Sequence, residues 1–124
     1  MFGKLVSTVL PIVPRAVVGH VAKRYIAGEG LTDAVHLVQK VNARGWAATV
    51  DLLGEEIFDL AGATVTTREY CHILEALDAG NCHSGVSLKL SALGIRVDEE
   101  ACMANLEEVL QLAMKLNRFV RIDM

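Results

Sequence analysis

Three charged side chains interrupt segments of the chain that are otherwise apolar. Asp51 lies in TVDLLG, Lys89 in SLKLS and Asp123 in VRIDM. An ionised group inside an apolar strand must be paired, hydrogen-bonded or functional, because burying a lone charge is costly. Each of the three stands near the carboxyl end of its segment, where parallel α/β folds bind their ligands. We therefore predict that two carboxylates and one ammonium converge at one edge of a parallel sheet.

Each of these charges also has a purely structural interpretation. Any one of them could cap a helix or pair with a neighbour at the end of a strand. Their recurrence at the same place in three successive units favours a common site over three separate pairings. In such a site, Lys89 could hold a substrate carboxylate as a point charge. A carboxylate there could orient an amine or tune a cofactor.

Two glutamates follow the first of these segments, directly after Gly54. We interpret Glu56 as a solvated loop charge. Glu55 follows the glycine turn immediately, so it could swing over the site as part of a lid.

The histidines and cysteines do not form a recognisable metal-binding or catalytic pattern. The pairs Cys71-His72 and Cys82-His83 are adjacent in the chain, which is not the ligand spacing of a tetrahedral zinc site. No cysteine stands at the end of a predicted strand, which disfavours nucleophilic cysteine catalysis. The glycines of AGEG follow no strand, so they do not form a dinucleotide-binding fingerprint. We predict no metal site.

Helical segments separate the three charged segments, which gives an α/β order. A short amphipathic helix is expected over 16–26. Strands are predicted near 46–52, 85–91 and 119–123, and helices near 32–44, 67–79 and 99–116. Strands separated by helices of this length imply right-handed parallel βαβ units.

Capping residues predict where the helices begin. Thr32 is the expected N-cap of the first of the three long helices, and Asp98 that of the last. The sequence from Thr66 to Glu69 is a capping box, which predicts the start of the middle helix, with 56–65 as a connector or short helix. The apolar run 46–53 has a single charge, which predicts a strand buried on both faces.

Composition excludes several classes of protein. The 124 residues are 52% hydrophobic and 22% charged, which is too apolar for a disordered chain. The net charge of −3, without a basic stripe, gives no support for nucleic-acid binding. No run of 18 apolar residues predicts a membrane span. Prolines interrupt the apolar run of residues 1–15, which argues against a signal peptide. The odd number of cysteines, three, suggests a reducing, cytoplasmic compartment.

The predicted architecture is incomplete by itself. A parallel sheet of three strands has two edges and too little helix to cover both of its faces. We therefore interpret 1–15 as a lead-in and 16–124 as the front portion of a longer α/β domain that stops after its third strand.

Four segments in this order resemble bacterial proline dehydrogenase: RYIAGEGLTDAVHLVQKVNARG, DLLGE, GVSLKLSALG and VRIDM. The resemblance covers residues 16–124. It implies a portion of a distorted (βα)8, TIM-like barrel that binds FAD. Members of that family oxidise L-proline to Δ1-pyrroline-5-carboxylate and pass the electrons to a membrane quinone.

The resemblance also implies roles for individual residues. Lys89 matches the strand lysine that contacts the substrate, and Asp123 matches the strand-end aspartate of the active site. Met124 matches the next position, which touches FAD. Glu55 matches the acidic loop residue that gates the site by pairing with an arginine. Asp51 lies in the same motif as Glu55, and its role is less defined.

The chain departs from the family in length, because a (βα)8 barrel needs about 250 residues. The later strands are missing, together with most of the FAD cradle and the arginine pair that holds the proline carboxylate. We therefore expect this chain to be inactive alone. The resemblance implies a cytoplasmic enzyme that, when complete, could associate with the inner face of the membrane.

Two other interpretations stay open. The chain could be a non-catalytic α/β fragment that associates with itself or with a partner chain through exposed strand edges. It could also belong to a different (βα)8 enzyme that has a coincidental rim of charges.

Overall fold

The computed structural model describes residues 30–52 and 57–123. The elements are α3 (Leu31–Ala43), β1 (Ala48–Asp51), α4 (Leu60–Ala79), β2 (Ser84–Lys89), the 3₁₀ turn η1 (Leu90–Leu93), α5 (Glu99–Lys115) and β3 (Val120–Asp123). The strands form one parallel sheet in the order β1-β2-β3. This confirms the predicted fold class, in which parallel strands alternate with helices. The predicted lead-in over 1–15 and the helix over 16–26 lie outside the described residues.

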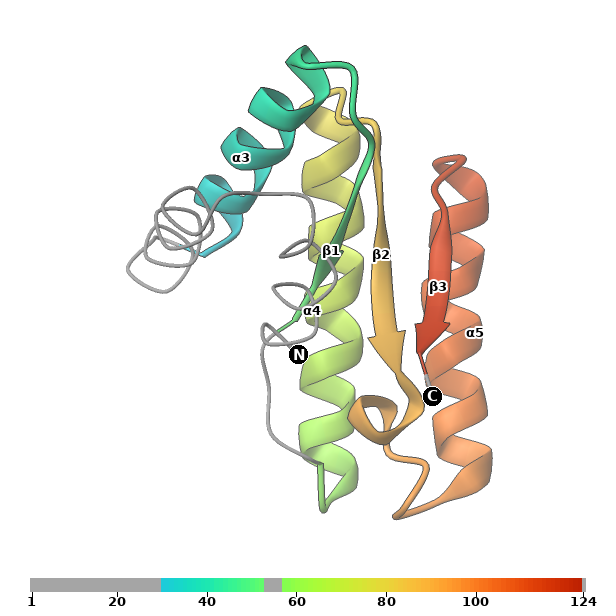
Figure 1. Ribbon diagram of the computed structural model, residues 1–124. Helices are drawn as coiled ribbons and strands as arrows, with labels where there is room; N and C mark the ends of the chain where they lie inside the picture. Colours follow the sequence, from blue (N-terminus) through green and yellow to red (C-terminus); the bar gives the residue numbers. More distant parts are fainter. Residues whose placement is uncertain (1–29, 53–56, 124) are drawn as a thin grey trace.

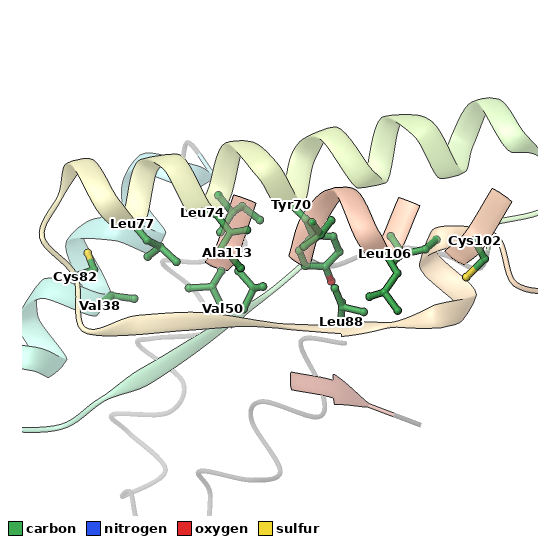
Figure 2. Close-up of a cluster of buried hydrophobic side chains, with 14 residues drawn as sticks. Val38, Val50, Tyr70, Leu74, Leu77, Cys82, Leu88, Cys102, Leu106 and Ala113 are labelled. Atoms are coloured by element: carbon green, nitrogen blue, oxygen red, sulfur yellow. The ribbon is translucent and has the colours of Figure 1, made fainter. Parts of the chain in front are cut away.

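The two long helices cover one face of the sheet. Figure 1 shows α4 and α5 side by side behind the strands, with α3 beside α4 and the start of β1. The core lies between these helices and the sheet, where Tyr70, Leu74 and Leu77 of α4 meet Val50 and Leu88 of the strands (Figure 2). Burying side chains of this size contributes about 1.5–3 kcal/mol each, so this layer is the main source of stability.

The strand register decides which residues share a face of the sheet. Val50, Val86 and Val120 lie in one row across the three strands. Because side chains alternate along a strand, this row and its even-numbered neighbours face the helices. The opposite face carries the odd-numbered residues, which are Thr49, Asp51, Gly85, Ser87, Lys89, Arg121 and Asp123.

The middle helix begins earlier than the capping box predicts. It starts at Leu60, and the carboxylate of Asp59 caps it by accepting a hydrogen bond of 2.6 Å from the N–H of Gly62. Thr67, inside the predicted box, is buried, and its hydroxyl donates to the carbonyl of Ala63 at 2.7 Å. The predicted start at Thr66 is therefore wrong, because an aspartate about two turns upstream supplies a cap first.

Of the other two predicted N-caps, one is confirmed and one is wrong. Asp98 caps α5, as predicted, by accepting from the N–H of Ala101 at 3.1 Å. The N-cap of α3 is Gly30 rather than Thr32, which lies in the first turn. Gly30 has a φ of 68°, a conformation that glycine adopts without strain, so the helix starts there without a side-chain cap.

The strands also differ from prediction in length and burial. Strand β1 is confined to Ala48–Asp51 and buries only Val50, while Trp46 is 53% exposed. The prediction that 46–53 is buried on both faces is therefore wrong, because β1 is an edge of the described sheet. Strand β2 ends at Lys89 rather than at 91, because the backbone turns there into η1.

Two polar side chains fasten the amino-terminal edge of the sheet. The amide of Asn42 donates to the carbonyls of Trp46 and His83 at 2.8 and 3.1 Å, and its oxygen accepts from the N–H of His83 at 2.7 Å. The guanidinium of Arg118 donates to the carbonyls of Cys82 and Ser84 and pairs with a carboxylate of α4. These two residues, the amino-edge clamp, hold the segments that lead into β1, β2 and β3.

Candidate functional site

The structure places all three strand charges at the carboxyl edge of the sheet. Asp51, Lys89 and Asp123 are the last residues of β1, β2 and β3. Lys89 and Asp123 are partners in the register between β2 and β3, and Asp51 is the partner of Ser87 two residues earlier on β2. All three side chains are partly buried. A cation therefore lies between two carboxylates on one rim.

Two residues that the sequence analysis did not single out share this face. Ser87 and Arg121 stand in one cross-strand row with Asp51. Ser87 is only 3% exposed, and within the part of the chain described its hydroxyl has no hydrogen-bond partner. The signal that could have found both is the strand period of two, counted back from Lys89 and Asp123. The face thus adds a hydroxyl and a second cation to the three strand charges.

Tyr70 is a further residue that the sequence analysis did not single out. It is fully buried, and its hydroxyl lies 3.2 Å from Oδ1 of Asp51. The same hydroxyl lies 3.0 Å from the carbonyl oxygen of Ser87 and 3.4 Å from the N–H of Leu52. A buried tyrosine usually finds a partner for its hydroxyl, and that rule was the available signal. Tyr70 therefore connects the core directly to the rim of charges.

The pKa of Asp51 is raised above its ordinary value of 3.8. Burial is the largest cause, because it disfavours the charged carboxylate. The hydrogen bond from Tyr70 acts in the opposite direction, the charge of Asp123 raises the pKa, and the ammonium of Lys89 lowers it. The charges of Asp123 and Lys89 therefore act on the pKa of Asp51 in opposite directions.

A rim with one ammonium and two carboxylates suits a zwitterionic small molecule. The ammonium can hold a carboxylate, and the carboxylates can hold an amine. Two of the predicted site residues, Glu55 and Met124, lie outside the described residues. The rim as described therefore consists of Asp51, Lys89 and Asp123.

The N-termini of α4 and α5 do not fit the phosphates of FAD. A dinucleotide is commonly held at a helix N-terminus, where backbone N–H groups and the helix dipole attract the pyrophosphate. The N-terminus of α4 is already capped by Asp59. That of α5 is capped by Asp98 and carries Glu99 and Glu100 in its first turn, which repel an anion. Neither helix N-terminus therefore offers an anion site.

The described part of the chain holds neither a metal-binding cluster nor a membrane-spanning helix. Among residues 30–52 and 57–123, no group of histidine, cysteine and carboxylate side chains is placed to hold a metal ion. None of the helices in these ranges combines the length and the apolar character that crossing a bilayer requires.

Comparison with known proteins identifies relatives of part of the chain. No family model matches the sequence. Proline dehydrogenase 1 of Bacillus subtilis is 32% identical over 103 residues, which are 83% of this chain and 34% of that protein. Proline dehydrogenase 2 of the same species is 30% identical over the same length. Proline dehydrogenase of Deinococcus radiodurans is 32% identical over 108 residues, 85% of this chain and 35% of that protein.

A solved structure shows the same arrangement of elements. Proline utilization A (PutA) from Bdellovibrio bacteriovorus, in the form inactivated by N-propargylglycine, superposes with a TM-score of 0.72 and 24% sequence identity. The superposition covers 86% of this chain and 14% of that protein. This likeness establishes the fold, in which three parallel strands alternate with helices. The sequence identities show distant homology to the bacterial proline dehydrogenases, over a region that spans about a third of their length.

Proposed function

We propose that this chain supplies the substrate-holding rim of a proline-oxidising site. The observation that carries the proposal is the strand register that places Lys89 opposite Asp123 at the carboxyl edge. It occurs in a chain distantly homologous to proline dehydrogenases. Three charges at one rim have no evident role in packing the core, which lies on the other side of the sheet. They match the charges of an amino acid substrate.

L-Proline is a zwitterion that carries a carboxylate and a secondary ammonium on the same carbon. In the proposed arrangement, the ammonium of Lys89 holds the substrate carboxylate. Asp123 holds the ring nitrogen, and Asp51 reinforces the negative potential beside it. These residues would fix the orientation of the proline ring, and a fixed orientation is what makes a bound substrate ready to react.

The proposed role is a partial one, because the chain spans about a third of the length of its relatives. The N-termini of α4 and α5 do not accept the phosphates of FAD, so these two helix ends would not hold the flavin that the resemblance implies. Holding reactants in a productive geometry is worth about 7–11 kcal/mol of activation barrier. We therefore expect residues 1–124 alone, even with excess FAD, to show no proline-dependent dye reduction above a no-enzyme control.

A chimera tests the proposal directly. The matching third of Bacillus subtilis proline dehydrogenase 1 is replaced by this chain, and proline-dependent dye reduction is measured together with flavin absorbance. We expect activity that Lys89→Met lowers about 10–100-fold, because a charged hydrogen bond contributes about 1.5–3 kcal/mol. Lys115→Met, at the exposed end of α5, is the matched control. Equal activity of the two variants would refute the proposed role of the rim.

A second candidate function is self-association without catalysis. It is favoured by the apolar surface along β3, the last strand of the described sheet, where Phe119 is 62% exposed and Met114 on the adjoining helix is 80% exposed. An unpaired strand edge beside apolar side chains is a template for pairing with another chain. Sedimentation equilibrium of this chain and of its Phe119→Lys variant tests this candidate. A monomer in both cases would exclude it.

A further inference from the structure

The hydroxyl of Tyr70 occupies an unusual position between the core and the rim. The ring belongs to α4 and packs in the apolar cluster, where Figure 2 shows it pointing from the helix toward β2. The hydroxyl emerges where β1 ends. There it reaches two backbone groups on neighbouring strands, the N–H of Leu52 and the carbonyl oxygen of Ser87. The phenol therefore bridges β1 and β2 at the point where their ladder stops.

The same hydroxyl also meets a carboxylate. Oδ1 of Asp51 lies 3.2 Å away and is an acceptor when the carboxylate is ionised. We propose that Tyr70 is the positioning residue of Asp51: its hydroxyl, fixed by the core and by two strand ends, sets the orientation of the carboxylate and shares a proton with it. The role that Tyr70 thereby gains in the substrate rim rests on the function proposed above.

The count of hydrogens explains how the proton is shared. A phenol has one hydrogen and two lone pairs. When Asp51 is ionised, the hydrogen of Tyr70 points to Oδ1. When Asp51 is protonated, its own O–H can donate to the phenol oxygen, and the hydrogen of Tyr70 turns to the carbonyl of Ser87. Both protonation states of the carboxyl are therefore hydrogen-bonded, and neither requires the ring to move.

Burial strengthens the interaction between Tyr70 and Asp51. Tyr70 is fully buried, so no solvent competes for its hydroxyl. The carboxyl of Asp51 is in an environment that disfavours its charge, and the phenol is the group on α4 that favours it. Among the described residues, the other charged groups that face Asp51 are Lys89 from β2 and Asp123 from β3. Tyr70 is the neutral partner whose contribution a conservative variant can remove.

Tyr70→Phe keeps the ring in the core and removes only the hydroxyl. The pKa of Asp51 is measured by NMR titration of its carboxyl carbon in the intact chain. We expect the pKa to rise in Tyr70→Phe, because a donor that favours the ionised form is lost. The matched control is Thr67→Val, which removes a buried hydroxyl from the same helix that bonds only within α4. An Asp51 pKa equal in the two variants would overturn the proposal.

A second measurement keeps the proposal falsifiable if Tyr70→Phe fails to fold. The chain contains two tyrosines, so Tyr25→Phe leaves Tyr70 as the single tyrosine. Incorporating 3-fluorotyrosine into that variant gives Tyr70 a more acidic hydroxyl, which donates more strongly. We expect the pKa of Asp51 to fall relative to the unfluorinated variant, and no change would overturn the proposal. Neither readout depends on proline oxidation, so this inference and the proposed function can fail separately.

Discussion

Gly85 offers a sharp test of how β2 and β3 are joined. A Cβ added to Gly85 would lie 2.7 Å from the carbonyl carbon of Phe119 and closer still to its oxygen. That oxygen accepts a 3.0 Å hydrogen bond from the N–H of Val86, so it cannot move away without breaking a strand contact. Because the clash is with backbone, no side-chain rotation relieves it. Gly85→Ala should therefore force β3 away from β2.

The expected cost follows from two contributions. Overpacking a well-packed site costs about 1–3 kcal/mol. Losing the hydrogen bond from Val86 adds about 0.5–1.5 kcal/mol. We therefore expect Gly85→Ala to lower the free energy of unfolding by about 2–4 kcal/mol. Opening β2 from β3 would also disturb the register that aligns Lys89 with Asp123.

Urea unfolding followed by circular dichroism measures the loss, and amide hydrogen exchange locates it. The amide of Val86 should lose protection in Gly85→Ala. Gly45→Ala is the control, because Gly45 has a φ of 85° but nothing within 4 Å of an added Cβ. It should cost about 1–2 kcal/mol from backbone strain alone and leave Val86 protected. An unchanged unfolding free energy with a protected Val86 amide in Gly85→Ala would refute the described packing of β3.

Two further predictions concern titratable groups. Because the folded-state pKa of Asp51 is raised, the protonated carboxyl favours folding, and that stability is lost as the pH rises from 3.8 through the raised pKa. Asp51→Asn should remove this loss. Urea unfolding from pH 3 to pH 8 should therefore show that the unfolding free energy of the variant rises relative to that of the wild type in this pH window. Parallel pH dependences of the two free energies would contradict the prediction. Burial raises the pKa of the Cys82 and Cys102 thiols, so iodoacetamide at pH 8 should modify them slowly until urea is added, as mass spectrometry can show. Fast modification of the native chain would contradict the buried placement of these two thiols.

The sequence was sufficient to predict the order of elements and the rim of charges. A charge inside an apolar strand is a strong signal, because it conflicts with its surroundings unless something compensates it. Asp51, Lys89 and Asp123 each produced that signal, and the alternation of strands with helices placed them at one edge. Asp98 was also predictable, because its cap depends only on residues within one turn of it.

The remaining features depend on contacts that sequence patterns do not contain. Tyr70 fits an apolar helix face, and only the packing of α4 on the sheet shows that its hydroxyl meets Asp51. Asp59 and Thr66 are both valid helix starts locally, and in the structure it is Asp59 that caps α4. The strand period places Ser87 on the same face as Lys89, but its position in one row with Asp51 depends on the register between strands, which tertiary packing sets.

The amino-edge clamp has a consequence for how this protein tolerates change. Asn42 and Arg118 bind backbone carbonyls, which every residue type supplies. Apart from the pair that Arg118 makes with Asp78, the clamp therefore does not depend on the side chains around it. The opposite edge carries its charges on side chains alone. Substitutions there can exchange one recognition chemistry for another while the frame of the sheet is kept. The two ends of the same three strands can therefore be selected independently. The amino edge can be selected for stability, and the carboxyl edge for recognition of a different ligand.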